Sequence, residues 1–367
     1  MPIYMDVHIV PGIKAKDVAE AHRKDILLEA EYECKCMTYW IDEERENVFC
    51  LIEAPGKQAV EDMHRKSHGL IPNKIIEVSS VLVESFLGRI YDPSNASVTA
   101  DGLKVFNDSS FRTIVLVSTA DRDILSVQLG KSKAAELYSN LTSSINAATS
   151  GFDGKLVEHR GPGIILSFTS ASQAVAFARR VVRDLDQEII QTLELKIGIS
   201  AGEPVSKSDE FFGDTVRLAA RVTRLSTNVI IRLTTMVKEL IPGTLPEDHE
   251  AAIHVVSYRD EVFLLQFFDK LDQHWSEPDF GIMDYCHALA MSKSQFYRKC
   301  IDLFGCSPIV LIKDYRLRQA REMMRSTRNV GQITFDSGFT SPSYFTKCFK
   351  KKFGVQPVAY MDMLHND

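Results

Sequence analysis

Four histidines and one cysteine in the first seventy residues could bind a transition metal. They are His8, His22, Cys50, His64 and His68. His64 and His68 are four residues apart, so on a helix both side chains would project from one face and could share one ion. Imidazole and thiolate donors suit nickel, zinc or copper better than magnesium. Scattered histidines are also common on protein surfaces, so the spacing alone leaves open whether these residues form a site.

A second set of side chains, suited to binding a polyanion, lies near the carboxyl end. Residues 279–367 carry a net charge of +5, whereas the rest of the chain carries −11 and the whole chain −6. One basic region on an acidic protein favours a local module that binds a polyanion. On a helix over 342–353, the outward face would carry Ser343, Thr346, Lys347, Lys350 and Lys351. Hydroxyl and ammonium groups of this kind contact phosphates and base edges in protein–DNA complexes.

Two helix-turn-helix units joined by one long helix are predicted to position these side chains. The units span 282–305 and 329–354, and the joining helix spans 307–326. Ser292 and Ser341 are suited to cap the second helix of each unit, and a glycine follows each helix. The residues expected to pack inward are Phe296, Cys300, Ile301 and Phe304 in the first unit, and Ile333, Phe335, Tyr344, Phe345, Cys348, Phe349 and Phe353 in the second. Two recognition helices about one DNA turn apart can enter successive major-groove segments.

Residues 279–363 resemble the DNA-binding domain of AraC/XylS-type transcription regulators. The strings that carry the resemblance are FGCSPI at 304–309, YRLRQAR at 315–321 and DSGFTSPSYFTKCFKKKFGVQP at 336–357. The positions that the resemblance assigns to reading base edges are Ser294, Tyr297 and Arg298 in the first recognition helix, and Ser343, Thr346 and Lys347 in the second. Arg298 could contact a guanine through two hydrogen bonds. The lysines at 350–352 are expected to touch phosphates and to set affinity and salt dependence.

The metal-ligand candidates lie in a segment that alternates strand, helix, strand, strand, helix and strand. The predicted elements span 3–10, 15–31, 34–42, 47–55, 56–69 and 74–83. This order is that of the ferredoxin-like sandwich, in which two helices cover one sheet. It would place His8 on the first strand, His22 on the first helix, Cys50 on the hairpin and the histidine pair on the second helix.

Residues 1–80 resemble a small family of ferredoxin-like nickel-binding domains. The matching strings are MDVH, AEAHRKD, YWID, VFCLIEAP and HRKSHGLIPNKIIEV. The resemblance implies that the four histidines and Cys50 hold nickel or another divalent transition metal. Asp25, Tyr39 and Glu53 are then candidates for outer partners that orient a ligand.

Residues 111–240 resemble the catalytic domain of class III nucleotidyl cyclases. The resemblance rests on GKLVEHRGPGIILSF at 154–168, LKIGISAGEPV at 195–205 and GDTVRLAARV at 213–222. Such cyclases hold two metal ions with two aspartates, but the aligned positions here are Ser118 and Pro162. Arg217 stands where the family has an asparagine, and Arg221 alone matches the family's transition-state arginine. We therefore expect no cyclase activity, and a role in dimerisation or in effector binding instead.

The whole chain is predicted to form three domains. They are an α+β ferredoxin-like domain at 1–88, an α/β cyclase-like domain at 111–270 and an all-α double helix-turn-helix domain at 279–367, with a linker at 89–110. Residues 251–268 are expected to add two strands to the middle domain, and 272–280 a break before the last one. The chain lacks an apolar stretch long enough for a membrane span. Its seven cysteines, an odd number, favour reduced thiols in the cytoplasm.

Together these features predict a transcription regulator that binds double-stranded DNA, forms a homodimer and responds to a metal or small-molecule effector. It is expected to be cytoplasmic and not to be an enzyme. Two alternatives remain open from the sequence. One is a cyclase with rearranged metal ligands, and the other is a metal-binding or storage protein.

Overall fold

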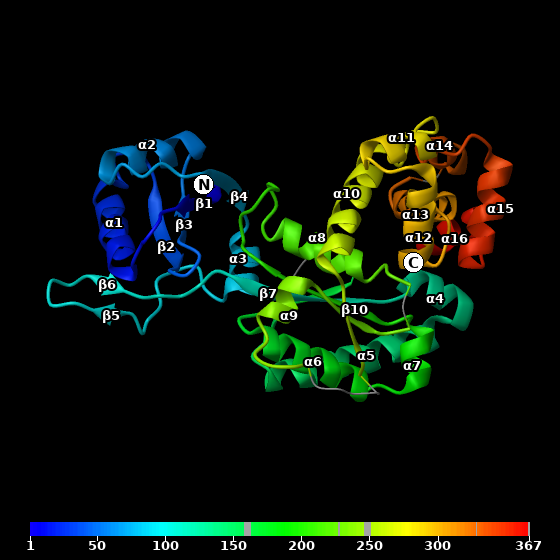
Figure 1. Ribbon diagram of the computed structural model, residues 1–367, viewed down its shortest axis with the longest axis horizontal. Coiled ribbons are helices and arrows are strands. Elements are labelled where there is room, and N and C mark those ends of the chain that lie inside the picture. Colours follow the sequence, from blue (N-terminus) through cyan, green and yellow to red (C-terminus); the bar gives the residue numbers. More distant parts are fainter. Residues whose placement is uncertain (158–162, 227, 246–250, 328, 366–367) are drawn as a thin grey trace.

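The computed structural model describes residues 1–157, 163–226, 228–245, 251–327 and 329–365. Figure 1 shows the amino-terminal sheet and its helices at one end, the large central sheet in the middle and the carboxyl-terminal helices at the other end. None of the helices in these ranges is long and apolar enough to cross a bilayer.

The amino-terminal part is a four-stranded antiparallel sheet with two helices on one face. Its elements are β1 (Ile3–Ile9), α1 (Ala15–Leu28), β2 (Lys35–Asp42), β3 (Asn47–Glu53), α2 (Lys57–Ser67) and β4 (Lys74–Val78). The strand order is β2-β3-β1-β4. Val18 and Ala19 of α1 and Val60 and Met63 of α2 form one core with the strands. The predicted ferredoxin-like sandwich is thus confirmed.

The prediction of a strand over 74–83 is wrong in its second half. β4 ends at Val78, and a helix, α3 (Ser80–Leu87), follows directly. Val83, Phe86 and Leu87 are its buried side chains, and their spacing of three and four residues is helical. They pack between the open face of the amino-terminal sheet and the central sheet in one continuous apolar cluster, so α3 joins the two domains.

The predicted linker 89–110 packs onto the amino-terminal domain. It contains a short hairpin, β5 (Ser97–Val98) and β6 (Lys104–Val105). Phe106 stacks on Tyr39 with ring centroids 4.1 Å apart, and the guanidinium of Arg89 lies 4.4 Å from the ring of Trp40. This segment, rich in Ser, Asn and Asp, therefore forms an ordered cover here, because Leu103 and Phe106 are buried.

The central domain is a six-stranded mixed sheet in the order β12-β11-β10-β7-β9-β8. Its elements are β7 (Arg112–Ser118), α4 (Arg122–Leu129), α5 (Lys131–Gly151), β8 (Lys155–Val157), β9 (Ile164–Phe168), α6 (Ala171–Arg183), α7 (Gln187–Thr192), β10 (Lys196–Gly202), α8 (Gly213–Val222), β11 (Ile231–Leu233), α9 (Thr235–Glu239) and β12 (Ile253–Val255). α5 and α6 cover one face, and α3 and α8 cover the other. Both faces of this sheet are thus covered within the described part of the chain.

Residues 251–268 do not form two strands. After the short β12, Ser257 caps a helix, α10 (Tyr258–His274), by accepting a hydrogen bond from the backbone of Asp260. The buried residues of this helix recur at helical spacing: Phe263, Leu264, Phe267, Phe268 and Leu271. α10 therefore continues into the predicted break at 272–280, and it packs against both α8 and the first helix-turn-helix unit.

The carboxyl-terminal part consists of six helices. They are α11 (Ile282–Ala288), α12 (Lys293–Phe304), α13 (Pro308–Met323), α14 (Val330–Asp336), α15 (Pro342–Phe353) and α16 (Pro357–His365). Ser292 and Ser341 cap α12 and α15, as predicted. Gly305 and Gly354 end these helices with φ angles of 66° and 77°, which glycine adopts without steric cost. The predicted double helix-turn-helix arrangement is confirmed.

Candidate metal centre and nucleic-acid interface

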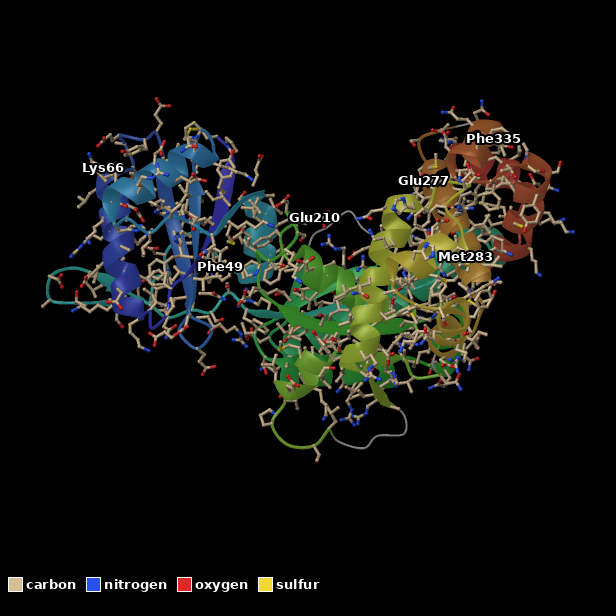
Figure 2. The ribbon with its side chains drawn as sticks, turned by 45° about the horizontal axis from the view of Figure 1, so that its top comes forward. Phe49, Lys66, Glu210, Glu277, Met283 and Phe335 are labelled. Atoms are coloured by element: carbon tan, nitrogen blue, oxygen red, sulfur yellow. The ribbon has the colours of Figure 1, made fainter. Side chains whose placement is uncertain are left out.

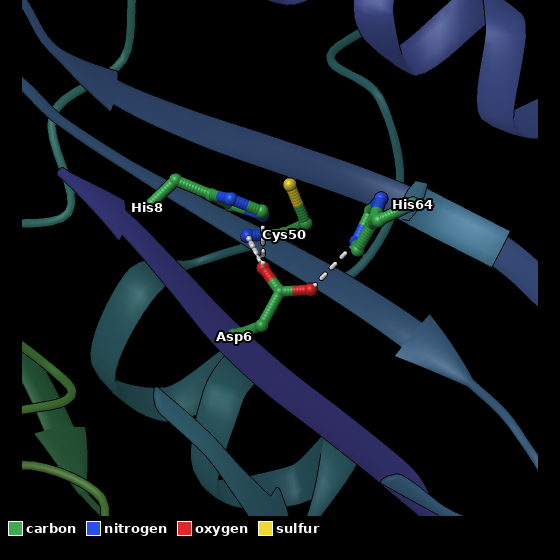
Figure 3. A group of neighbouring side chains, drawn as sticks. All are labelled: Asp6, His8, Cys50 and His64. Carbon is green, nitrogen blue, oxygen red and sulfur yellow. Dashed lines mark hydrogen bonds and ion pairs between the residues drawn. The ribbon is translucent and has the colours of Figure 1, made fainter. Parts of the chain in front are cut away.

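Four potential metal ligands converge between the amino-terminal sheet and its helices. Asp6, His8, Cys50 and His64 each offer an atom, and these atoms all lie within 4.8 Å of one another (Figure 3). Asp6 and His8 are two residues apart on β1 and so share the face that the helices cover. Cys50 lies opposite Asp6 in the register of β1 and β3, and His64 reaches the group from α2.

The Asp6 carboxylate is the centre of this group. Its Oδ2 lies 2.8 Å from Nε2 of His64, and its Oδ1 lies 3.4 Å from Nε2 of His8. The backbone N–H of Cys50 donates a hydrogen bond of 3.2 Å to Asp6 Oδ1. The buried Nδ1 of His8 has no hydrogen-bond partner among the described residues. Such an atom favours a ligand at this place, because a buried polar atom is otherwise paired.

A second group shares His64. Asp25 of α1, His64 and His68 also bring one atom each within 4.8 Å of one another. Nδ1 of His64 lies 3.2 Å from Asp25 Oδ1 and 3.0 Å from Nε2 of His68. The hydroxyl of Ser67 donates to the same Asp25 oxygen. The two ring nitrogens of His64 thus face two different carboxylates.

The buried charges of the group depend on one another. Burial opposes ionisation of Asp6 and Asp25, yet the neighbouring histidines hold the pKa of each carboxyl well below its usual range. Burial likewise opposes protonation of His64, but the carboxylates on either side raise its pKa to about 10. The pKa of the Cys50 thiol is raised by burial and by the nearby Asp6. The two carboxylates on either side of His64 therefore favour its protonated form, and burial favours the thiol form of Cys50.

The metal-free amino-terminal domain is expected to lose stability as the pH rises from 6.5 towards 10. The pKa of His64 is about 10 in the folded chain, against an ordinary value of 6.5. Its stabilising contribution is therefore complete below pH 6.5 and is lost as the pH rises through about 10. The contributions of Asp6 and Asp25 have the opposite sign, since their depressed pKa values make them complete above the ordinary carboxyl value of 3.8.

Urea unfolding in the presence of a chelator would measure this dependence. The protein has two tryptophans, and Trp40 is buried on the face of the amino-terminal sheet that packs against α3. In a Trp275→Phe variant, the emission would come from Trp40 and would follow the amino-terminal sheet together with its packing against α3. The same unfolding midpoint at pH 6.5 and pH 10 would contradict the assignment of a protonated His64.

The donor set fits a divalent transition metal. Two imidazoles, a thiolate and a carboxylate suit nickel or zinc, and a metal can displace protons from His64 and Cys50. Asp25 lies where an outer partner would hold the other ring nitrogen of His64. Sequence reasoning missed Asp6, although its place two residues before His8 on a strand could have shown that both face the same side.

Three residues predicted near the metal lie outside both groups. His22 is buried beside Asp92, with its Nε2 3.8 Å from Asp92 Oδ1, and its ring meets that of Tyr39 edge to face. Glu53 pairs with the amino terminus of Met1 at 3.4 Å. These contacts give each residue a role in packing or in surface charge, without a place in either group.

Most of the predicted base-reading and phosphate-contacting side chains are exposed on α12 and α15. Ser294 and Arg298 of α12 and Ser343, Lys347, Lys350 and Lys351 of α15 are exposed, whereas Tyr297 and Thr346 are half-buried. Lys352 is an exception among the predicted phosphate contacts, because its ammonium lies 2.5 Å from Asp314 of α13. Its charge is therefore already compensated within the domain.

Three apolar residues predicted to pack inward are exposed instead. Ile301, Phe335 and Tyr344 have exposed fractions of 52%, 56% and 53%; Phe335 is labelled in Figure 2. Their helices bury Cys300, Ile333 and Phe345 instead. Helices as short as α14 bury only a narrow stripe, so a residue next to a buried one need not be buried.

Besides packing against α10, the helix-turn-helix domain contacts the central domain after α8 and at α4. The backbone N–H of Ser226, which follows α8, donates to the carbonyl of Leu303 at the end of α12. On the other side, α4 packs Ile124 into the core of the second unit. Arg325 also lies 2.6 Å from Asp123 of α4. Most of the outward positions of both recognition helices stay exposed in this arrangement.

The two arginines at cyclase-like positions are both paired within the chain. Arg217 lies 2.8 Å from Glu210 and 2.5 Å from Asp214. Arg221 is buried and lies 2.6 Å from Asp269 and 3.2 Å from Asp272, both on α10. Ser118 ends β7, and Pro162 lies outside the described residues. The guanidinium predicted to match the family's transition-state arginine thus joins α8 to α10.

Two protein families match separate parts of the chain. Residues 285–363 match the family described as "Helix-turn-helix domain", and residues 4–78 match "Nickel responsive protein SCO4226-like". These matches confirm the predictions of a helix-turn-helix domain at the carboxyl end and of a nickel-responsive-type domain at the amino end.

Individual relatives cover the same parts. The HTH-type transcriptional activator FapR of Escherichia coli is 32% identical over 104 residues, which make up 28% of this chain and 37% of FapR. SCO4226 of Streptomyces coelicolor A3(2) is 30% identical with a TM-score of 0.20, over 21% of this chain and 94% of that one. An adenylate/guanylate cyclase/hydrolase of Silicibacter pomeroyi is 20% identical with a TM-score of 0.30, over 38% and 83%. The chain spans 8% to 45% of the length of the curated relatives it matches.

Proposed function

We propose that this chain, with its helix-turn-helix domain and its nickel-responsive-type domain, is a transcription regulator whose affinity for DNA depends on a bound divalent transition metal. The observation that carries the proposal is the presence in one chain of a buried group of potential metal ligands and of two recognition helices, most of whose outward side chains are exposed. Nickel is the first candidate, since the family matched by residues 4–78 is described as nickel responsive.

Asp6, His8, Cys50 and His64 would hold the metal, and Asp25 would orient His64. A bound divalent ion supplies the positive charge that a proton supplies on His64 in the metal-free chain. His64 and Cys50 would release their protons on binding, so the affinity is expected to fall as the pH falls. Asp25 would keep its contact with Nδ1 of His64 and so fix the orientation of the ring.

A continuous set of packed elements supports communication between the metal site and the DNA-binding helices. Met5 and Val7 alternate with the ligands on β1 and pack towards α3 and α8. The ammonium of Lys74 donates to the backbone carbonyls of Ser206 and Ser208, just before α8. α8 is in turn joined by Arg221 to α10. A metal that favours one arrangement of these elements would change DNA affinity by the difference in its binding free energy.

An electrophoretic shift on the DNA upstream of the chain's own coding sequence tests the proposal. The full chain would be titrated against this duplex and a scrambled duplex of equal length, after chelation and after reloading with nickel. We expect a preference for the upstream duplex, and a difference in affinity between the two metal states. Equal binding to both duplexes in both states would refute a metal-responsive regulator.

A homodimer formed through the central domain is part of the proposal, because the cyclases that this domain resembles work as dimers. A small-molecule effector of that domain is a second possible input. We place the protein in the cytoplasm, where the operator DNA lies. Sedimentation equilibrium of the full chain would show whether its mass is that of one copy or two.

The two alternative functions have less support. A cyclase needs carboxylates for its metal ions, and Ser118 offers none, while Arg217 and Arg221 are already paired with acidic residues. Incubation with ATP or GTP and Mg²⁺ or Mn²⁺ would reveal any cyclic product. A metal-storage role would leave the two exposed recognition helices without a function. A storage protein would show no preference for one DNA sequence over another.

A further inference from the structure

A cavity of about 210 Å³ lies beside the candidate metal ligands. α1 contributes one wall, β1 and β3 contribute the floor, and the residues after α2 complete it. Its floor carries the buried side chains of His8 and Cys50, and its rim carries the exposed side chains of Asp17, Lys24 and Leu70. The cavity thus runs from the surface down to two of the four ligands.

Only two of the four candidate ligands line this cavity. His8 and Cys50 line it, whereas Asp6 and His64 do not. Asp6 and His64 therefore lie on the closed side of the group, and His8 and Cys50 lie on its open side. A metal held by all four would have protein on one side and the cavity on the other. Sites that keep an open position accept an outside ligand, whereas purely structural sites are closed.

The size and lining of the cavity define what fits. An apolar cavity of about 150 Å³ binds benzene, so this cavity is large enough for a small ring. Ile13, Val18 and Val48 provide apolar surface. The lining holds the carboxyl groups of Asp17, Glu20 and Asp25, the ammonium of Lys24 and the imidazoles of His8, His22 and His68. With neutral imidazoles its net charge is negative, which disfavours an anion.

We propose that this cavity admits one small uncharged nitrogen donor, of the size of imidazole, to the open side of the metal held by Asp6, His8, Cys50 and His64. The donor nitrogen would replace water at the metal, with no change of oxidation state, and its ring would lie against the apolar wall. The inference rests on the proposed metal site, and it gives that site a second ligand besides the ion.

Absorption spectroscopy of the nickel-loaded full chain tests this inference. Nickel bands and the thiolate-to-nickel band change when a ligand of the metal changes, and neither depends on DNA. The nickel-loaded protein would be titrated with imidazole and, separately, with acetate at the same ionic strength. We expect a saturable spectral change with imidazole and none with acetate, while gel filtration and metal analysis show that nickel stays with the protein.

A cavity-filling variant and its control locate the binding. Ala21 of α1 lines the cavity, and Ala21→Leu would fill part of it. This variant should keep nickel but bind imidazole about tenfold more weakly or worse. Ala30→Leu, at an exposed position beyond α1, should behave like the parent chain.

The outcomes separate this inference from the proposed function. Nickel binding without a spectral response to imidazole would overturn the inference and leave the metal site in place. Loss of nickel to the low-mass fraction on adding imidazole would overturn it as well. An equal response to acetate would refute the charge argument. Failure of the parent chain to bind nickel at all would overturn the metal site, and this inference with it.

Discussion

Replacing His64 with alanine is expected to lower the affinity for nickel by roughly 100-fold or more. Loss of an outer partner alone costs about 10- to 100-fold in metal affinity, and His64 belongs to both groups of candidate ligands. Isothermal titration with nickel, supported by metal analysis after dialysis, would measure the change.

The same substitution is expected to destabilise the metal-free domain. His64→Ala leaves the buried carboxylates of Asp6 and Asp25 without the cation that lies between them. Breaking a buried pair by removing one partner costs about 3–5 kcal/mol. His64→Gln keeps a polar group in the same place, so it should recover part of the stability without restoring the affinity for nickel.

His22→Ala is the matched comparison. The sequence suggests His22 as a candidate ligand together with His64, but the structure places it beside Asp92 and outside both groups. Its removal should leave the affinity for nickel close to that of the parent chain. If His22→Ala and His64→Ala weakened nickel binding equally, the assignment of the site to the group around Asp6 would be wrong.

Arg298→Ala is expected to relax sequence preference on DNA. Arg298 is exposed on α12, and a bidentate arginine–guanine contact contributes about 1–3 kcal/mol of discrimination. Binding should therefore weaken at the preferred duplex and change little on a scrambled one. Fluorescence anisotropy on both duplexes at one salt concentration would measure the ratio.

Lys350→Ala and Lys351→Ala should act differently from Arg298→Ala. Each is expected to weaken binding about equally on all sequences, and to make the slope of log K against log salt less steep by about 1. Lys352→Ala is the control on the same helix, because its ammonium already pairs with Asp314. It should leave the salt slope unchanged. If Lys352→Ala lowered the slope as much as the other two, α15 would meet DNA by another face.

Local sequence signals predicted the carboxyl-terminal helices well. Serine caps and following glycines fixed the ends of α12 and α15, because these residues act within one turn of the helix they bound. The same argument could not separate buried from exposed residues at Phe335 and Tyr344. Which side of a short helix is buried depends on neighbouring helices that are distant in sequence.

The strands predicted at the end of 74–83 and within 251–268 are wrong for one physical reason. The runs around Val83 and Phe267 are rich in residues that suit a strand as well as a helix, and short apolar runs do not distinguish the two. Their helical form is favoured by partners elsewhere: α3 packs between two sheets, and α10 packs between α8 and the first helix-turn-helix unit.

The sequence predicts which residue types are candidate metal ligands, but it does not predict which of these residues lie together. Histidine and cysteine are obvious candidates, so His8, Cys50, His64 and His68 could be selected from the sequence. The central Asp6 is one of 49 acidic residues, and only its register with Cys50 and its contact with His64 distinguish it. Only the three-dimensional structure shows that His22 lies apart from His8, His64 and His68.

The pairing of Arg221 with α10 limits what protein engineering could recover from the central domain. An aspartate introduced at 118 would leave the guanidinium of Arg221 bound to Asp269 and Asp272. Releasing it would require neutral residues on α10, and would thereby loosen the attachment of the DNA-binding helices. The guanidinium of Arg221 therefore cannot contact a nucleotide while it holds α10, which packs against the DNA-binding helices.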